Sequence, residues 1–356
     1  MINRKQIISL TKQTLIITLI TFGMTEIVFR VYASINPTFI FYDSSYNRYR
    51  GKPFSPNYDD KLNSQGFQGP EFTQEKPDNT YRILSIGDSF TFGILPVQYN
   101  YNSRIQRQLN RQLGDQGKQF QVINMGIPSI GPRDYLALLV NEGINLNPDM
   151  VMISVFIGND TLEAEREMEN QRDWYTYSHV LSFFNYVIQV QSKYEGELYG
   201  PNATYDESKP SLAADKFLEI QTGRATIFIK DNIEAMEAFN NQVEYIKQIK
   251  KICDSKNIKL LVVLIPDETQ VNPELQQQVI TNAQIDPADL DIKLPNRLFT
   301  EVFTKEKIEY LDLLDGFLVA SKEENLYKPQ DTHWNIAGNR VASRLITPKI
   351  IEQIQP

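Results

Sequence analysis

The chain has 356 residues, of which 41% are hydrophobic, which is enough to bury the core of one large catalytic domain. Its net charge of −8 argues against a nucleic-acid partner, because such a partner favours a basic face. The single cysteine, Cys253, excludes an intramolecular disulfide. The sequence has no Cys/His cluster and no glycine-rich phosphate loop, so neither a metal nor a cofactor is expected.

Residues 1–32 predict a membrane anchor helix. Arg4, Lys5 and Lys12 precede an uncharged run over residues 13–25, and the apolar side chains among residues 26–32 extend it. The extended run reaches the length of about 20 residues that a membrane span needs. With the basic residues on the cytoplasmic side, the remainder of the chain is expected outside the cytoplasm.

Two other interpretations of this segment stay open. Val31 and Ala33 resemble a signal-peptide cleavage site, and cleavage there would give a secreted protein. Glu26 and Arg30 are unfavourable neighbours for such a site, so an uncleaved anchor is the preferred interpretation. An amphipathic helix lying on the membrane surface is the third alternative.

Residues 33–79 are rich in proline and are expected to form an extended approach to a catalytic domain over residues 80–356. The domain begins with Ile83, Leu84 and Ile86, which predict a buried strand that Gly87 ends. Ser89 follows in Gly87-Asp88-Ser89, where its hydroxyl would be exposed at the carboxyl end of a sheet. A serine hydroxyl needs a base to become a nucleophile. Taken alone, Gly-Asp-Ser is also ordinary turn chemistry.

Two further predicted strands end in groups that suit an oxyanion hole. Residues 121–124 form a short strand that leads to Gly126, whose backbone N–H is unobstructed by a side chain. Residues 151–157 form a continuous apolar strand, typical of a parallel sheet covered on both faces, and Asn159 follows it. Donors aimed at a developing oxyanion contribute about 3–4 kcal/mol each in a known hydrolase. The alternative is that Gly126 and Asn159 only form turns.

Helical and strand patterns alternate through the rest of the chain, which predicts an α/β sheet. Apolar residues repeat every fourth position from Tyr101 to Leu113, and a second helical pattern leads into a strand over residues 259–265. A fifth strand is predicted over residues 308–313 and a closing helix over 337–351. Residues 161–230 form an insertion, which is either a lid or binding wall, or a solvated helix with a surface loop.

The chain contains two histidines, so the base for Ser89 is nearly chosen by elimination. His333 has Asp331 two residues before it, an acid that could orient the imidazole and stabilise its charged form. His179 has aromatic neighbours in the sequence but no carboxylate nearby, and it is expected to be a packed or surface residue. Ser89, His333 and Asp331 are therefore the expected catalytic residues.

These motifs resemble those of the SGNH (GDSL-type) hydrolases. The matching residues are Ser89 in Gly-Asp-Ser, Gly126, Asn159 in Gly-Asn-Asp, and His333, within a resemblance over residues 80 to 350. The resemblance implies a three-layer, flavodoxin-like α/β sandwich with a mostly parallel sheet of about five strands. It also implies that the N–H groups of Ser89 and Gly126 and the Asn159 side chain hold the oxyanion.

One spacing departs from the family. Most members have Asp-x-x-His, whereas this chain has Asp331-Thr332-His333-Trp334. That form is similar to an element of the alginate-type polysaccharide O-acetyltransferases, although in those relatives the element precedes the serine. The spacing therefore bears on the substrate class more than on the existence of a catalytic triad.

The expected function is a membrane-anchored serine acyl esterase or O-acyltransferase that acts on O-acetyl groups of an envelope or secreted glycan. The expected partners are the O-acylated glycan or another ester substrate and the membrane, with no nucleic acid. Any polysaccharide-export partners are left unidentified. The alternatives are a lipase or thioesterase, and a non-catalytic scaffold that binds glycan within an export complex.

Overall fold

The computed structural model describes residues 4–35, 50–51, 53–58, 60–114, 117–159, 178–192 and 204–355. The chain divides into two compact units. The first comprises Met1–Arg48 and Asn170–Gly196, and the second comprises Tyr49–Glu169 and Glu197–Pro356. Each unit is described by itself.

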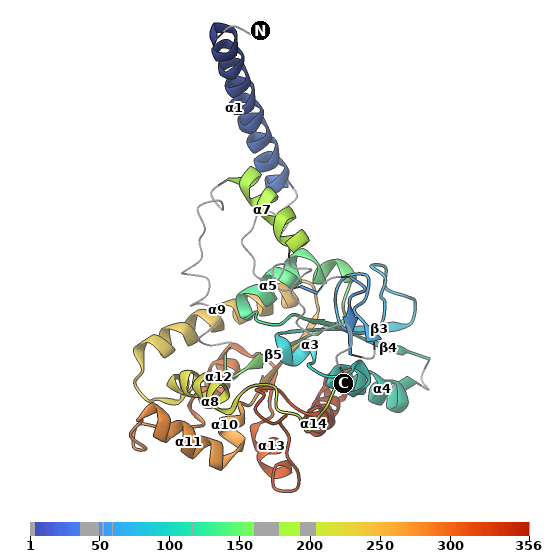
Figure 1. Cartoon of the computed structure of the whole chain (residues 1–356). Coiled ribbons are helices and arrows are strands. Elements are labelled where there is room, and N and C mark those ends of the chain that lie inside the picture. The colour runs from blue at the N-terminus through green and yellow to red at the C-terminus, as the bar shows by residue number, and fades with distance from the viewer. Residues whose placement is uncertain are drawn as a thin grey trace. The chain divides into compact units, whose positions relative to one another are not determined.

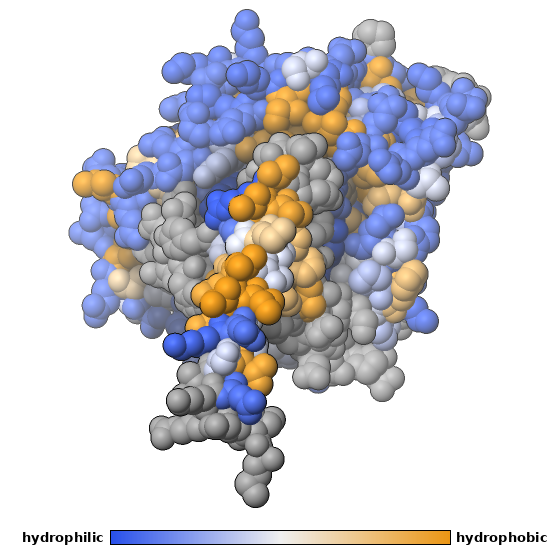
Figure 2. All heavy atoms as spheres, turned by 90° about the horizontal axis from the view of Figure 1, so that it is seen from above, coloured by the Kyte–Doolittle hydropathy of each residue, from blue (hydrophilic) through white to orange (hydrophobic). Residues whose placement is uncertain are grey.

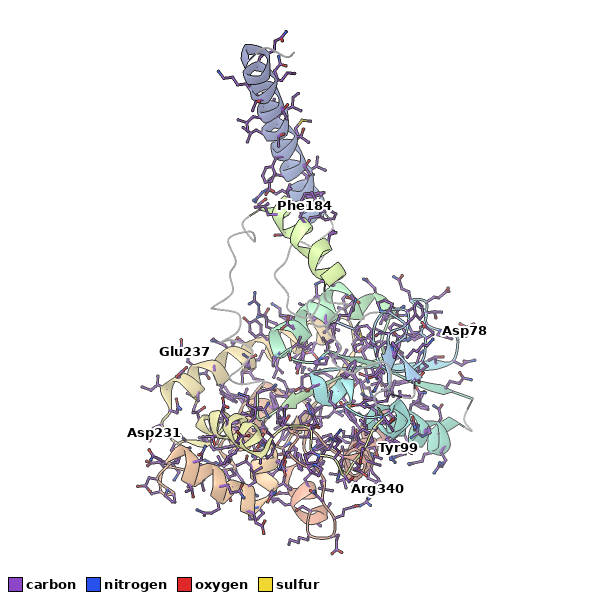
Figure 3. All side chains as sticks on the ribbon, viewed as in Figure 1. Asp78, Tyr99, Phe184, Asp231, Glu237 and Arg340 are labelled. Atoms are coloured by element: carbon purple, nitrogen blue, oxygen red, sulfur yellow. The ribbon has the colours of Figure 1, made fainter. Side chains whose placement is uncertain are left out.

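The first unit contains two helices, α1 (Arg4–Ile35) and α7 (His179–Ser192), which contact each other (Figure 1). Within α1, the segment Ser9–Val31 is long and apolar enough to cross a membrane, with a mean hydropathy of 1.7 and no residue buried. Figure 2 looks down on this helix and shows apolar side chains gathered along it. Phe184 of α7 is also exposed to solvent (Figure 3). The predicted amino-terminal apolar helix is therefore present.

The second unit is built on a sheet of five parallel strands in the order β4-β3-β5-β6-β7. Numbered within this sheet alone, β3 is the first strand and β4 the second, and β4 lies at the edge beside β3. The order is therefore 2-1-3-4-5, as in flavodoxin-like folds. The prediction of an α/β fold with a five-stranded parallel sheet is confirmed. The strands are β3 (Thr80–Gly87), β4 (Gln119–Gly126), β5 (Met150–Phe156), β6 (Lys259–Ile265) and β7 (Tyr310–Asp312).

Helices cover both faces of this sheet. On one face, α4 (Tyr101–Leu113) and α14 (Ile336–Ile354) contact each other and the sheet. On the other face, α5 (Pro132–Asn141) and α9 (Ile233–Ser255) do the same (Figure 1). Every residue of β5 is buried, as expected for a central strand between two helical layers. The predicted helix with an apolar residue at every fourth position is confirmed as α4, whose buried side chains include Ile105 and Leu109.

The second unit has further elements. They are β1 (Pro56–Asn57), β2 (Asp60–Lys61), α3 (Ser89–Phe92), η2 (Val97–Tyr99), η4 (Gly143–Leu146), α8 (Ala214–Arg224), η7 (Ala225–Phe228), α10 (Glu268–Val271), α11 (Pro273–Ala283), α12 (Leu294–Glu306) and α13 (Leu314–Ala320). Among them, α3 and α10 begin just beyond the carboxyl ends of β3 and β6. In an open parallel sheet this edge is where ligands bind.

At Gly126, the end of β4 lies close against α3. A Cβ atom built on Gly126 would lie 2.0 Å from the backbone nitrogen of Phe92 and 2.5 Å from the carbonyl carbon of Thr91. Both atoms are backbone, so no side-chain rotation relieves the clash. The absence of a side chain at this position therefore allows α3 to lie against the end of β4.

We predict that Gly126→Ala destabilises the second unit, because α3 must shift to admit the methyl group. Overpacking of this kind costs about 1–3 kcal/mol in the free energy of unfolding. The matched control is Gly114→Ala at the end of α4, where φ is −65° and the added Cβ would meet only Asn110 at 4.0 Å. Urea unfolding measures both variants, and equal stability for the two would contradict the steric argument.

Candidate active site

Ser89 is the first residue of α3, directly after the turn that ends β3. Asp88 caps this short helix, because its Oδ1 accepts the backbone N–H of Phe90 at 2.9 Å. Gly87 permits the turn, since a Cβ atom there would lie 2.1 Å from Thr91 Oγ1. The local sequence thus places the Ser89 hydroxyl at the carboxyl edge of the sheet.

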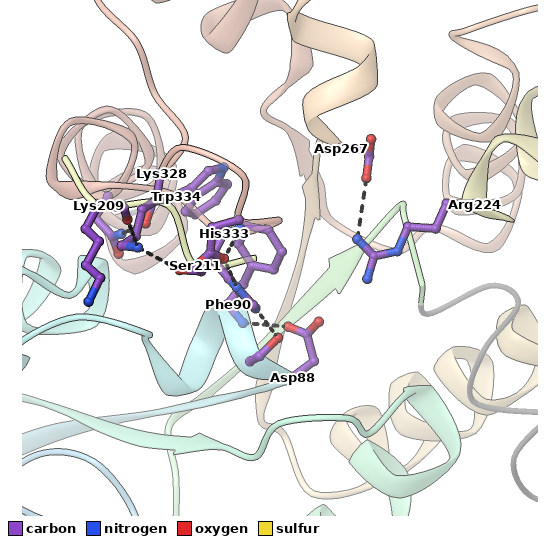
Figure 4. A network of polar contacts seen from close by, with 12 residues as sticks. Asp88, Phe90, Lys209, Ser211, Arg224, Asp267, Lys328, His333 and Trp334 are labelled. Atoms are coloured by element: carbon purple, nitrogen blue, oxygen red, sulfur yellow. Dashed lines mark hydrogen bonds and ion pairs between the residues drawn. The ribbon is translucent and has the colours of Figure 1, made fainter. Parts of the chain in front are cut away.

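The structure brings Ser89, His333 and Asp331 into one hydrogen-bonded chain (Figure 4). His333 Nε2 lies 2.7 Å from Ser89 Oγ, and His333 Nδ1 lies 2.6 Å from Asp331 Oδ1. The same Oδ1 accepts the backbone N–H of His333 at 3.0 Å. This tight turn explains how an acid only two residues before the histidine can still reach its ring.

A residue that sequence reasoning missed holds the other oxygen of Asp331. Ser211 Oγ donates to Asp331 Oδ2, and Lys328 Nζ donates to Ser211 Oγ at 2.6 Å. The backbone beside Ser211 is also tied to this loop, since the Leu212 N–H donates to the Gln330 carbonyl at 3.1 Å. Ser211 is 120 residues from Asp331 in the chain. No local pattern in the sequence indicates such a contact.

These contacts keep Asp331 ionised. Its burial by itself would raise the pKa of the carboxyl group, but hydrogen bonding and charge attraction from His333, with the hydrogen bond from Ser211, lower that pKa to about 2. Asp331 is only 5% exposed. A buried carboxylate that stays charged can stabilise the imidazolium that forms when a histidine accepts a proton.

Aromatic side chains pack against the ring of His333 and restrict its position. The ring centroids of Phe90 and His333 are 5.1 Å apart, and Phe90 meets Trp334 edge-on at 5.0 Å. Trp334 in turn stacks on Phe317 at 4.8 Å. Residues next to the two candidate catalytic groups in sequence, Phe90 and Trp334, therefore lock their relative position.

The two predicted oxyanion donors away from Ser89 lie at strand ends, but neither hydrogen-bonds to the Ser89–His333–Asp331 chain. Gly126 already donates its N–H to Asn124 Oδ1 at 2.9 Å, so this N–H is engaged in the present conformation. Asn159 is half-buried just past β5, and its buried Oδ1 has no hydrogen-bond partner among the residues described. The N–H of Ser89 itself donates to no described residue.

A second group missed by sequence reasoning lies beyond the ends of β5 and β6. Arg224, at the end of α8, places a terminal nitrogen 4.0 Å from Asp267 Oδ2 and its guanidinium 5.3 Å from the centre of the Phe156 ring. Asp88 is fully buried nearby, and burial raises its pKa to about 6 against the opposing charges of His333 and Arg224. Arg224 lies near the end of the predicted insertion over residues 161–230. The last part of that insertion therefore contributes a positive charge close to the site.

The segment Asn63–Gly69 supports the loop after α3. Gln68 Nε2 donates to the carbonyls of Gly93 and Leu95 at 3.1 and 2.9 Å. Asn63 Oδ1 shapes the segment by accepting the backbone N–H groups of Gln65 and Phe67. Gln68 is buried, so these bonds are shielded from water and fix the exit from α3.

His179 has a different setting. It begins α7 in the first unit, where its N–H donates to Glu26 Oε1 at 3.1 Å and its Nδ1 lies 3.9 Å from the same oxygen. Local sequence does not predict an acid beside His179, because Glu26 lies 153 residues away in the chain. No group of three His, Cys, Asp or Glu side chains within the described ranges is arranged as metal ligands.

Residues 227–355 match the family model described as an SGNH hydrolase-like domain of the acetyltransferase AlgX. The match includes Asp331 and His333 and begins after Ser89, Gly126 and Asn159. The resemblance to SGNH hydrolases is thus confirmed for the carboxyl-terminal part of the chain. No curated protein matches the sequence.

Solved structures similar to this chain include several esterases. An acetyl xylan esterase is 12% identical, with 76% of this chain and 99% of that chain covered and a TM-score of 0.43. A lipase/acylhydrolase from Enterococcus faecalis is 15% identical, with 77% and 96% covered and a TM-score of 0.42. These likenesses are too distant to carry an inference about the substrate of this chain.

We predict that Ser211→Ala lowers ester turnover about tenfold, because loss of a hydrogen bond to a charged group costs roughly 1.5–3 kcal/mol and part of it is felt in the transition state. The fall should appear in kcat more than in KM. Ser208→Ala is the matched control, since Ser208 lies in the same segment but bonds only to Asp206. Equal kinetics for the two variants would contradict a positioning role for Ser211.

A further prediction concerns Glu268, which is 8% exposed. Burial, with smaller contributions from the charges of Asp267 and Asp331, raises its pKa from 4.5 to about 8. The folded protein therefore holds a proton that the unfolded chain releases, and the stability that this gives is present below pH 4.5 and lost as the pH rises through 8.

We expect Glu268→Gln to be more stable than the unmodified protein at pH 8 by roughly 2–4 kcal/mol and similar to it at pH 4.5. Urea unfolding at both pH values measures the difference. The exposed Glu274 on α11 supplies the matched control, Glu274→Gln. A constant difference for Glu268→Gln would show that this carboxyl group does not retain its proton.

Proposed function

We propose that this protein is a membrane-anchored serine acyl esterase or O-acyltransferase that acts on O-acetyl groups of an envelope or secreted glycan. The single observation that supports the chemistry best is the hydrogen-bonded chain from Ser89 Oγ through His333 to Asp331. The match of residues 227–355 to an SGNH hydrolase-like domain agrees with acyl chemistry.

In this proposal, Ser89 Oγ attacks the carbonyl carbon of the ester while His333 Nε2 accepts the hydroxyl proton. The tetrahedral intermediate then breaks its bond to the sugar oxygen, and His333 returns the proton to that oxygen. An acyl group is left on Ser89. Asp331 holds the imidazole of His333 in one tautomer and stabilises the positive charge that the ring acquires. Asp331 can do this because its lowered pKa keeps the carboxylate ionised at neutral pH.

The proposed oxyanion donors are the Ser89 N–H, the Asn159 side chain and the Gly126 N–H. Ser89 is the best placed of the three, because its N–H has no other acceptor among the described residues. Gly126 can contribute only if its bond to Asn124 opens when substrate binds. Removing one such donor in a known hydrolase costs about 3–4 kcal/mol of transition-state stabilisation.

An esterase and a transferase share each of these groups and differ in what resolves the acyl-enzyme. Water gives free acetate, whereas a sugar hydroxyl gives a new ester. Purified protein incubated with an aryl acetate, with and without acceptor glycans, separates the two: acetate released in both samples indicates an esterase, and acetate found on the glycan indicates a transferase. Preference for long acyl chains or thioesters would instead support a lipase or thioesterase.

We predict that Ser89→Ala and His333→Ala each reduce ester turnover by a similar factor, on the order of 10⁶, because members of a triad act as a unit. Asp331→Asn should lose an equal or smaller factor. The measurement is turnover of an aryl acetate, with circular dichroism to show that each variant is folded.

Near-normal activity of Ser89→Ala would show that another residue is the nucleophile. If neither the unmodified protein nor its variants turned over any ester while folded, the non-catalytic glycan-binding scaffold would be the better interpretation. A harmless Asp331→Asn would assign the orienting role to another acid or to a backbone carbonyl.

A further inference from the structure

Helix α7 has an unusual composition for a helix with exposed side chains. Charged residues make up 22% of the chain, but α7 contains no Asp, Glu, Lys or Arg over its 14 residues. Phe184 is 56% exposed on this helix, among neighbours that are mostly aliphatic or aromatic (Figure 3). An exposed apolar surface without charges is typical of a helix that contacts lipid.

The start of α7 is fastened to α1 by Glu26. The Glu26 carboxylate accepts the Ser178 hydroxyl at 2.8 Å and the backbone N–H groups of His179 and Val180 at 3.1 and 3.0 Å. These are the groups that an N-cap residue normally satisfies, so a side chain of α1 caps α7. The rings of Phe29 and Phe183 meet at 5.2 Å and extend the contact by one turn.

These contacts determine the depth and direction of α7. Glu26 precedes Val31, the last residue of the apolar segment of α1, by five positions, or about 7 Å along a helix. Because Val180 meets Glu26 and Phe183 meets Phe29, α7 runs in the same direction as α1. If α1 spans a membrane with its basic end in the cytoplasm, α7 begins inside the outer boundary of that membrane and runs outward.

The polar contacts of Glu26 fit such a location. A carboxylate within a membrane segment is costly unless it is paired. Here Arg30 Nε also donates to Glu26 Oε1 at 2.7 Å, so the charge has a cation and hydrogen-bond donors around it. The exposed Phe184 follows Phe183, whose ring contacts Phe29 of α1.

We propose that α7 is a second membrane-contacting element, whose exposed Phe184 lies in the outer-leaflet lipid beside α1 and whose amino end is held there by Glu26. The partner is the lipid of the bilayer that α1 crosses. This inference goes beyond the proposed catalytic function and rests only on the proposal that α1 is an uncleaved anchor.

The test uses the full-length protein in phosphatidylcholine vesicles. Phe184→Cys is labelled with an environment-sensitive fluorophore and exposed either to nitroxide-labelled lipid or to aqueous iodide. Val319→Cys, on α13 of the second unit, is the matched control, because Val319 is 67% exposed. The buried Cys253 stays unlabelled in the folded protein. We expect at least threefold stronger quenching by the lipid nitroxide than by iodide at position 184, and the reverse at position 319.

Glu26→Ala should lower the lipid quenching at position 184 at least twofold, because the carboxylate that holds the amino end of α7 against α1 is lost. Quenching at position 184 by iodide alone, or by neither reagent, would overturn the proposal, the second result indicating a protein partner instead. Carbonate extraction of the vesicles distinguishes the two levels of failure. Release of the protein by carbonate overturns the anchor, whereas retention with iodide quenching overturns the role of α7 alone. Neither result changes the expected loss of esterase activity in Ser89→Ala.

Discussion

The candidate site depends on one constraint, the parallel direction of all five strands. Because the strands run the same way, their carboxyl ends share one edge of the sheet, and the residues that follow β3, β5 and β6 meet there. Ser89, Asn159 and Asp267 reach this edge from different parts of the chain. Close approach is then allowed by glycine, since side chains at Gly87 or Gly126 would collide with α3.

The site is completed by a loop that no strand end supplies. Asp331 uses one oxygen for both the backbone and the ring of His333, which makes a two-residue spacing sufficient. Its other oxygen is held by Ser211, and Arg224 lies beside Asp267 beyond neighbouring strands. Both residues come from the end of the long insertion. The end of the insertion therefore contacts the candidate catalytic groups directly.

In the first unit too, a side chain from one part of the chain supports an element that is distant in sequence. The Glu26 side chain accepts the first two N–H groups of α7, while Ser178 just before the helix accepts the N–H of Leu181. A carboxylate that looked unfavourable in an apolar segment thus has a structural explanation, and it connects the amino-terminal helix to residues about 150 positions later in the chain. The same carboxylate is the acid that lies beside His179, whose neighbours in the sequence include no acid.

The sequence by itself determined the α/β class, the strands and helices with clear periodicity, and the three residues of the hydrogen-bonded chain at Ser89. Those features are local, because strand burial, helix repeats and short motifs are written within a few consecutive residues. The tertiary structure alone decided that Ser211 binds Asp331, that Gln68 supports the exit from α3 and that Glu26 binds the amino end of α7. Such contacts join residues whose approach depends on how the whole chain folds, so no spacing in the sequence encodes them.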